Sequence, residues 1–210
     1  MMTEKEICQH LDSKLDEFLQ KIRFPILRDL LKESLYFAGG CIYCLRNDKV
    51  VKDYDMFLMD DDLIEDLKQL DIWNFTSDYA LSCGKFQVVI KYFGDPDSCI
   101  AEFDFKHNMH YYIPGSGGIR CGYLDEIVGE LDELPDEVDF EHFKYLQTNE
   151  LYFNENRARD CEGVWLRIKK FTDRGMTISK ETKKKIKKKI TKKGIRKYKK
   201  SCHNGNKNYY

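Results

Sequence analysis

The spacing of apolar residues divides the first part of the chain into helices and strands. Apolar side chains recur at helical intervals over residues 4–22, and Pro25 begins a second helical stretch that continues to about Ser34. The segment 35–38 is short and apolar, and residues 53–59 alternate between polar and apolar positions. These patterns predict two helices and two strands.

Two more strands are predicted downstream. Residues 86–93 and 99–106 are rich in aromatic and β-branched side chains, and the turn sequence at 94–97 separates them. Residues 164–171 combine apolar and basic side chains in a helical pattern, and residues 124–141 are acidic and helix-prone. The sequence therefore predicts an α+β fold, in which a small mixed or antiparallel sheet is flanked by helices and followed by a helical, basic C-terminal extension.

A pair of glycines lies between the predicted strand at 35–38 and residues 41–45, which could open a helix. Because glycine has no Cβ, the backbone at a strand-to-helix turn can approach a phosphate group closely. Gly39 and Gly40 are therefore predicted to bind phosphate.

Acidic residues accompany the predicted strands. Strand alternation places Asp53 and Asp55 on one face as neighbours. In the segment 99–106, Glu102 and Asp104 would likewise share a face. If the two strands are adjacent, three or four carboxylates converge on one cleft, and such a cluster calls for divalent cations such as Mg²⁺.

These residues resemble a known family. Gly39-Gly40, Asp53-x-Asp55 and Asp104 are similar to the head of the polymerase-beta-like nucleotidyltransferase superfamily, and their spacing is closest to that of poly(A) polymerase and tRNA CCA-adding enzyme heads. The resemblance covers residues 30–110. It implies that the first two aspartates bind two Mg²⁺ ions, with Mn²⁺ as an alternative, that Asp104 is the third ligand and helps to activate the attacking hydroxyl, and that the glycines hold the triphosphate.

The predicted nucleotide site also includes basic residues. The resemblance extends weakly towards residues 167–175, and the candidates for nucleotide binding are Arg46, Lys52, Arg167 and Lys169. The chain departs from CCA-adding enzymes at Tyr43 and Cys44, where those enzymes typically carry Arg-Asp, and it has no clear counterpart of their Glu-Asp-x-x-Arg signature. ATP is one candidate nucleotide, but the sequence does not fix the choice.

Charge is distributed unevenly along the chain. Residues 1–166 contain 17 Lys and Arg against 34 Asp and Glu, a net charge of −17, whereas residues 167–210 contain 18 against 2, a net charge of +16. A basic segment of this kind attracts polyanions, although a lysine run can also be only a solvated helix or tail. The predicted contacts to nucleic acid are made by Lys183, Lys184, Lys185, Lys187, Lys188, Lys189, Lys192 and Lys193.

Composition and patterning also predict the domain organisation and the setting. We expect a nucleotidyltransferase head over 1–150, a helical appendage over 151–178 and a basic tail over 179–210. The chain lacks a long apolar run and a secretion signal, so a cytoplasmic protein is predicted. The 8 cysteines are scattered, and only Cys41-x-x-Cys44 has the spacing of zinc ligands. We interpret the cysteines mainly as reduced packing residues.

Three further groups of residues have two interpretations each. Residues 60–62 are three aspartates that could cap a helix or bind metal, and capping is favoured. His107 and His110 could contact a phosphate or an acceptor, or form a polar turn. The glycine-rich segment 113–118 is interpreted as a surface loop.

The predicted activity is metal-dependent transfer of a nucleoside monophosphate from a nucleoside triphosphate to an acceptor hydroxyl, with release of pyrophosphate. RNA is the predicted acceptor because of the basic C-terminal segment. Two alternatives remain open: nucleotidylation of a small molecule or a protein, and a non-catalytic nucleic-acid-binding relative of these enzymes.

Overall fold

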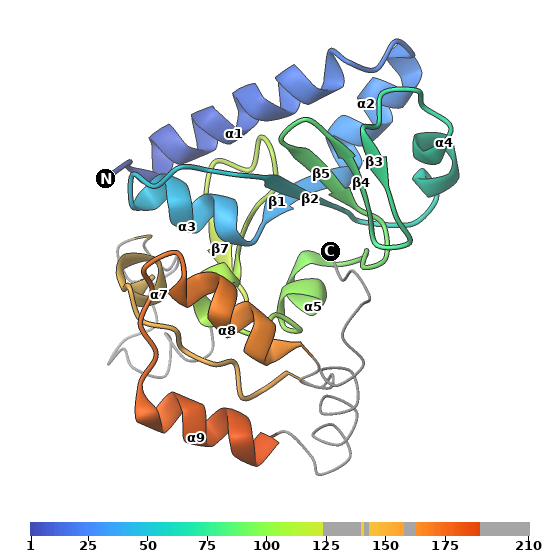
Figure 1. The fold of residues 1–210 in the computed structure, drawn as a ribbon. Coiled ribbons are helices and arrows are strands. Elements are labelled where there is room, and N and C mark those ends of the chain that lie inside the picture. The colour runs from blue at the N-terminus through green and yellow to red at the C-terminus, as the bar shows by residue number, and fades with distance from the viewer. Residues whose placement is uncertain (124–139, 141–142, 158–162, 190–210) are drawn as a thin grey trace. The chain divides into compact units, whose positions relative to one another are not determined.

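The computed structural model describes residues 1–123, 140, 143–157 and 163–189 (Figure 1). The chain separates into two compact units. The first unit consists of Met1–Phe103 and His107–Thr148, and the second consists of Asp104–Lys106 and Asn149–Tyr210.

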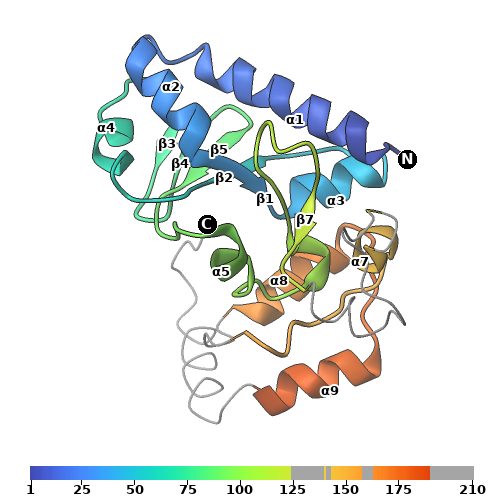
Figure 2. The ribbon, with the colours of Figure 1, turned by 180° about the vertical axis from the view of Figure 1, so that it is seen from behind.

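Two helices open the first unit, as predicted. Helix α1 (Glu4–Leu19) begins at a capping box, in which Thr3 caps the helix and Glu6 bonds back to the Thr3 backbone. Helix α2 (Pro25–Ser34) begins with Pro25, whose fixed φ suits the first helical turn. Figures 1 and 2 show both helices on the same side of the sheet.

A mixed sheet forms the centre of the first unit, which confirms the predicted fold class. Its strand order is β3-β4-β5-β2-β1-β6-β7, and the β2–β5 pair is parallel whereas the others are antiparallel. The strands are β1 (Leu35–Ala38), β2 (Tyr54–Leu58), β3 (Phe75–Thr76), β4 (Ala80–Cys83), β5 (Phe86–Val89), β6 (His110–Tyr112) and β7 (Arg120–Cys121).

Aromatic side chains fill both faces of this sheet. On the face covered by α1, the ring of Phe18 lies 5.6 Å from that of Phe86. On the opposite face, Phe57 stacks on Tyr36 at 5.6 Å and lies 5.8 Å from Phe103. Asp55 lies on this second face as well, because it is two residues from Phe57 along β2 and side chains two apart in a strand share a face.

The strand predicted over residues 99–106 is wrong. Helix α5 (Pro96–Ile100) occupies the start of that segment, on the side of the sheet opposite α1 (Figures 1 and 2). The Asp95 side chain caps it by accepting a hydrogen bond of 3.0 Å from the Ser98 N–H, and Pro96 opens its first turn. An aspartate followed by proline is a helix start, and here this signal overrides the alternation of Phe103 and Phe105.

Short helices complete the first unit: α3 (Gly40–Arg46), α4 (Ile64–Lys68), the 3₁₀ turn η1 (Lys106–Asn108), which begins in the second unit, and α7 (Lys144–Gln147). The aspartates before α4 do not cap it. Its N-cap is Leu63, and Asp60 instead accepts a hydrogen bond of 3.2 Å from the Asp62 N–H in a local turn. The predicted helix within 124–141 lies largely outside the described residues.

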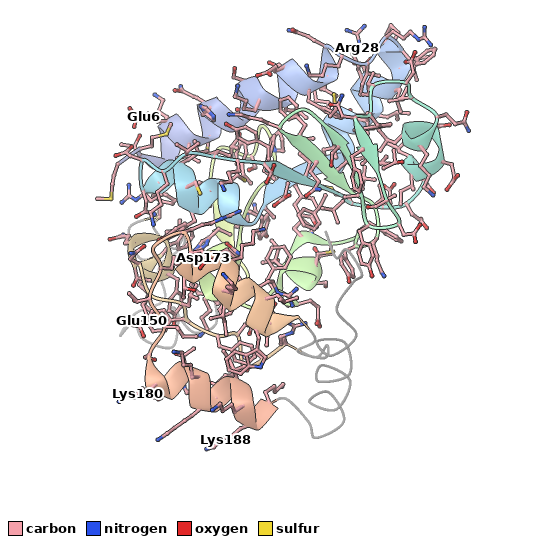
Figure 3. The ribbon with its side chains drawn as sticks, viewed as in Figure 1. Glu6, Arg28, Glu150, Asp173, Lys180 and Lys188 are labelled. Atoms are coloured by element: carbon pink, nitrogen blue, oxygen red, sulfur yellow. The ribbon has the colours of Figure 1, made fainter. Side chains whose placement is uncertain are left out.

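The second unit contains helices α8 (Val164–Thr172) and α9 (Lys180–Lys189). Phe105 forms an isolated bridge with Phe153, and its ring lies 5.7 Å from that of Phe171 on α8. Phe103 and Phe105, two residues apart, therefore belong to the cores of different units. Lys180 and Lys188 lie near the two ends of α9 (Figure 3).

Within the described residues, every helix is too short or too polar to cross a bilayer.

Candidate active site

Asp55 lies against the glycine turn. The antiparallel pairing of Phe37 with Met56 brings Asp55 to the end of β1, where Gly39 follows. Gly39 has φ +85°, and a Cβ added there would lie 3.5 Å from Asp55 Oδ2 and 3.8 Å from the ring of Phe103. The missing side chain thus leaves space directly beside a carboxylate, and the positive φ favours glycine for its conformation as well.

Part of the backbone of the turn is hydrogen-bonded to the sheet. The Gly39 N–H donates a hydrogen bond of 3.3 Å to the carbonyl of His110 in β6, so this N–H is an anchor for the turn and not the predicted phosphate donor. Gly40 begins α3, and a Cβ there would lie 3.8 Å from Asn108 Oδ1. The turn lies where the sequence predicted it, but the sheet uses one of its donors.

Two buried histidines support the strand that anchors this turn. His110 Nδ1 donates to the carbonyl of His107 at 3.1 Å, and its Nε2 accepts from the hydroxyl of Tyr123 at 2.5 Å. The ring of His107 meets that of Tyr43 edge-on. Both histidines are buried, and His107 lies in the 3₁₀ turn η1. The predicted turn is therefore present, whereas a contact of these side chains with a phosphate or an acceptor stays a prediction.

This burial predicts a loss of stability in mild acid. Burial lowers the pKa of His107 and His110 to about 3 from an ordinary value of 6.5. Below pH 6.5 the unfolded chain therefore takes up two protons that the folded chain does not bind. The free energy of unfolding should fall by up to about 2–3 kcal/mol per pH unit between pH 6.5 and 3.

Denaturant unfolding at pH 7, 6 and 5 measures this slope, and a His110→Gln variant should show about half of it, since one proton remains. Equal stability of the parent chain at pH 7 and pH 5 would contradict the assignment.

Asp53 and Lys52 precede β2 and are exposed. β2 begins at Tyr54, whose N–H donates to the Lys85 carbonyl at 2.7 Å, and Asp55 is half-buried. Burial raises the pKa of the Cys41 thiol, and the nearby Asp55 carboxylate raises it further. The negative charge of Asp55 therefore acts electrostatically on the first turn of α3.

A row of polar side chains, which the sequence patterns did not predict, crosses the sheet from Asp55. Asp55 pairs with Gln87 in β5, and Gln87 pairs with Ser82 in β4. All three residues are half-buried. The signal in the sequence was one polar residue within the apolar run 86–90, but strand register, which sequence does not reveal, is needed to place it beside Asp55.

Asp104 forms ion pairs within the second unit. Its two carboxylate oxygens pair with Arg157 Nη1 and Arg167 Nε. The side chains of Asp104 and Arg157 are 4% and 6% exposed, whereas that of Arg167 is 43% exposed. The carboxylate expected to bind metal on a strand instead lies outside any named strand and contacts two guanidinium groups.

Two other candidate basic residues make local contacts. Arg46, at the end of α3, is buried, donates to the Met2 carbonyl at 2.8 Å and lies 4.9 Å from the ring of Phe140. Lys169 pairs with Asp173 at 2.7 Å along the exposed face of α8. These contacts give Arg46 a structural role at the chain's N-terminal end.

The six lysines of α9 that were predicted to contact nucleic acid divide into two groups. Thr182 and Ile186 form the buried face of the helix. Lys185 pairs with the Glu155 carboxylate at 2.8 Å, and Lys189 donates to the Glu155 carbonyl at 3.0 Å. The other four are exposed on the side of the helix away from the buried face, and we call them the exposed lysine face: Lys183, Lys184, Lys187 and Lys188. Lys192 and Lys193 lie outside the described residues.

In the described part of the chain, no cluster of three or more His, Cys, Asp or Glu side chains could hold a metal ion. The six described cysteines are free thiols, and Cys41 of the Cys-x-x-Cys pair is buried. Asp53 and Asp55 therefore form an acidic pair that needs further oxygen ligands to hold a cation.

Comparisons with known proteins agree with the fold. A family model described as Gabija anti-defense 2 family protein (Gad2) matches residues 9–118. A CCA-adding enzyme in complex with ATP is 13% identical with a TM-score of 0.53, over 94% of this chain and 50% of that one. A tRNA-processing enzyme in an apo form is 15% identical with a TM-score of 0.50, over 83% and 46%.

This chain thus spans about half the length of those solved structures, and at this identity they show its fold alone. No curated protein matches the sequence. The fold is that of a nucleotidyltransferase head, and because the family model matches more than half of the chain, the protein belongs to the Gabija anti-defense 2 family.

Proposed function

We propose that this protein is a metal-dependent nucleotidyltransferase, which moves a nucleoside monophosphate from a nucleoside triphosphate to an acceptor hydroxyl on RNA. The observation that carries the proposal is the position of Asp55 against the side-chain-free turn at Gly39. A carboxylate beside a turn without a side chain is suited to a metal-bound triphosphate, whose oxygens and cation both require close approach.

The residues present fit a divalent cation. Asp53 and Asp55 supply hard carboxylate oxygens, the first exposed and the second half-buried, and a Cβ at Gly39 would fill the space beside Oδ2 of the second. Mg²⁺ and Mn²⁺ both accept such ligands. When bound, the cation neutralises triphosphate charge and lowers the pKa of an acceptor hydroxyl.

In the proposed reaction, the acceptor oxygen bonds to the α-phosphorus while the bond from that phosphorus to the oxygen bridging to the β-phosphorus breaks. The electron pair of the broken bond leaves with pyrophosphate, and the hydroxyl proton passes to water. Asp53 and Asp55 would hold the cation beside the triphosphate, and the absence of a side chain at Gly39 leaves room for the triphosphate. Transfer of this kind depends mainly on positioning and charge stabilisation.

A role for Asp104 as third ligand remains a separate proposal. It requires this carboxylate to exchange Arg157 and Arg167 for a cation. The same holds for Arg167 and Lys169 as triphosphate contacts: Arg167 is partly exposed beside Asp104, and Lys169 would have to leave Asp173.

RNA is the favoured acceptor because of the exposed lysine face of α9. Lys183, Lys184, Lys187 and Lys188 point away from the buried Thr182 and Ile186 side of the helix. A row of lysines on one helix face attracts phosphates and releases counterions when it binds them. A protein acceptor, which the sequence analysis left open, is the second candidate.

The test incubates the full chain with each labelled nucleoside triphosphate, Mg²⁺ and either total RNA or a protein extract. We expect label in RNA. Changing the four exposed lysines to glutamine should weaken RNA binding and reduce the slope of log K against log salt by about 3, since each phosphate contact on a single strand contributes about 0.7.

Changing four exposed lysines elsewhere to glutamine removes the same charge and is the matched control: Lys5, Lys32, Lys68 and Lys91. Label in protein but not in RNA would establish the second candidate. An absence of labelled product with every triphosphate and both acceptors would refute nucleotidyl transfer to RNA or protein.

A further inference from the structure

Helix α2 presents large apolar side chains to solvent. Ile26 and Leu30, one turn apart, are 77% and 45% exposed, and Phe24, directly before the helix, is 50% exposed. Leu31, in contrast, is fully buried and packs α2 onto the first unit. Single apolar residues are common on protein surfaces, but three of them within seven residues of one helix indicate an interaction surface.

Two acidic side chains lie on the same side of α2 as Ile26. Asp29 and Glu33 follow it at helical intervals of three and seven residues, and both are exposed. Among the residues that the structure describes, neither forms an ion pair or a side-chain hydrogen bond. Lys32 is rotated by roughly 120° from Ile26 around the helix and lies off this side. Like charges one turn apart on a helix repel each other, so a basic partner from outside α2 would stabilise this side.

A basic side chain lies at the opposite end of this apolar surface. Arg23 is exposed, and its guanidinium lies 5.3 Å from the centre of the Phe24 ring. Arg23 precedes the midpoint between Ile26 and Leu30 by five positions, and Glu33 follows that midpoint by five positions. The surface therefore has a basic end and an acidic end, equally far along the chain from its apolar centre.

This arrangement is complementary to itself. In a two-fold contact each copy uses the same surface, and whenever residue i meets residue j, residue j also meets residue i. If two α2 helices lie antiparallel with their centres aligned, Ile26 of each copy is level with Leu30 of the other, and Arg23 of each is level with Glu33 of the other. Opposite charges at the rim of an interface fix its register and disfavour wrong partners. The acidic side chains also disfavour an anionic partner such as nucleic acid.

We propose that α2 is the contact of a homodimer, in which two copies of this chain pair their α2 helices antiparallel about a two-fold axis. The apolar side chains form its centre, and an Arg23–Glu33 ion pair forms at each end. The proposal does not depend on nucleotidyl transfer, since α2 lies on the α1 side of the sheet and Asp55 lies on the opposite face (Figures 1 and 2). Two helices of 10 residues form a small interface, so we expect a weak dimer.

Sedimentation equilibrium of the full chain, from about 10 µM to about 1 mM, measures the association in the range of weak complexes. The apparent mass should rise from 25.0 kDa towards twice that value. Changing Ile26 and Leu30 together to serine should weaken the dimer at least about tenfold, because both side chains lose their burial in the contact. Val50→Ser is the matched control, since it removes an apolar side chain that is 81% exposed elsewhere in the same unit.

Charge reversal tests the antiparallel register. Arg23→Glu and Glu33→Arg each place like charges at both ends of the contact, so each variant should dimerise more weakly than the parent chain. Mixing the two variants in equal amounts brings opposite charges together at both ends. A heterodimer should therefore form at concentrations at which neither variant associates alone, and the double variant Arg23→Glu with Glu33→Arg should dimerise like the parent.

Thermal unfolding of each variant checks that it folds, and these exposed positions should leave the parent's unfolding temperature nearly unchanged. A parent chain that stays at 25.0 kDa up to the highest concentration would overturn the proposal and leave the surface to a different partner. Undiminished association of the Ile26→Ser, Leu30→Ser variant would place the contact elsewhere and overturn it too. A mixture of the two charge variants that associates no better than its components would refute the antiparallel pairing.

Discussion

Replacing Asp104 with alanine should destabilise the second unit by about 3–5 kcal/mol. The carboxylate is nearly inaccessible and pairs with Arg157, which is also buried, and with Arg167. Removing it leaves a guanidinium in a low-dielectric environment without this partner, and neither water nor the cavity left by the substitution restores the lost interaction. On an exposed strand in an acidic cluster, the same substitution would have changed stability little.

Hydrogen exchange of the α8 amides and denaturant unfolding measure this effect. Asp173→Ala is the matched control, because it removes an aspartate of the same unit whose pair with Lys169 is exposed. Exposed pairs contribute about 0–1 kcal/mol, so the control should be nearly neutral. The double substitution Asp104→Leu with Arg157→Met should recover part of the stability, since it removes both buried charges together. Equal stability of Asp104→Ala and Asp173→Ala would show that the pairing with Arg157 contributes little.

The contrast between Asp55 and Asp104 shows which structural features of this chain can be predicted from sequence patterns. Local signals placed α1, α2, β1, the glycine turn and the start of β2 correctly, because a capping box, Pro25, an apolar run and strand alternation each act within a few residues. The segment after β5 contained two conflicting local signals. The helix start at Asp95-Pro96 is realised there, and the apparent alternation of Phe103 and Phe105 reflects two separate cores.

The contacts that could not be predicted from the sequence depend on pairing between residues far apart in the chain. The place of Gln87 beside Asp55 depends on the register of a parallel pair whose strands are separated by β3 and β4. The burial of His107 and His110 depends on the packing of Tyr43 and Tyr123 around them. Neither Arg157 nor Asp104 has a local feature that marks the other as its partner. Such contacts follow from the fold and are not encoded in any short window.

Replacing Asp55 with asparagine should lower the rate of nucleotidyl transfer at least about a hundredfold, because loss of an outer partner of a metal ligand alone reduces activity about 10–100-fold. The substitution keeps the size of the side chain and one oxygen but removes the negative charge beside Gly39. Labelled product from RNA and each triphosphate, followed over time at fixed Mg²⁺, measures the rate. Asp78→Asn, at an exposed position between β3 and β4, should retain full activity.

The same substitution should change the free energy of unfolding by no more than about 0.5 kcal/mol, as expected for a partly exposed polar position outside the core. Activity and stability thus separate at Asp55, whereas at Asp104 a loss of stability should accompany any loss of activity. Raising the Mn²⁺ concentration should recover part of the activity of Asp55→Asn if the defect is weaker cation binding, since the neutral amide oxygen can still coordinate. Full activity of Asp55→Asn at limiting Mg²⁺ would show that Asp55 does not belong to the catalytic site. The space beside Gly39 would then no longer support the proposed function.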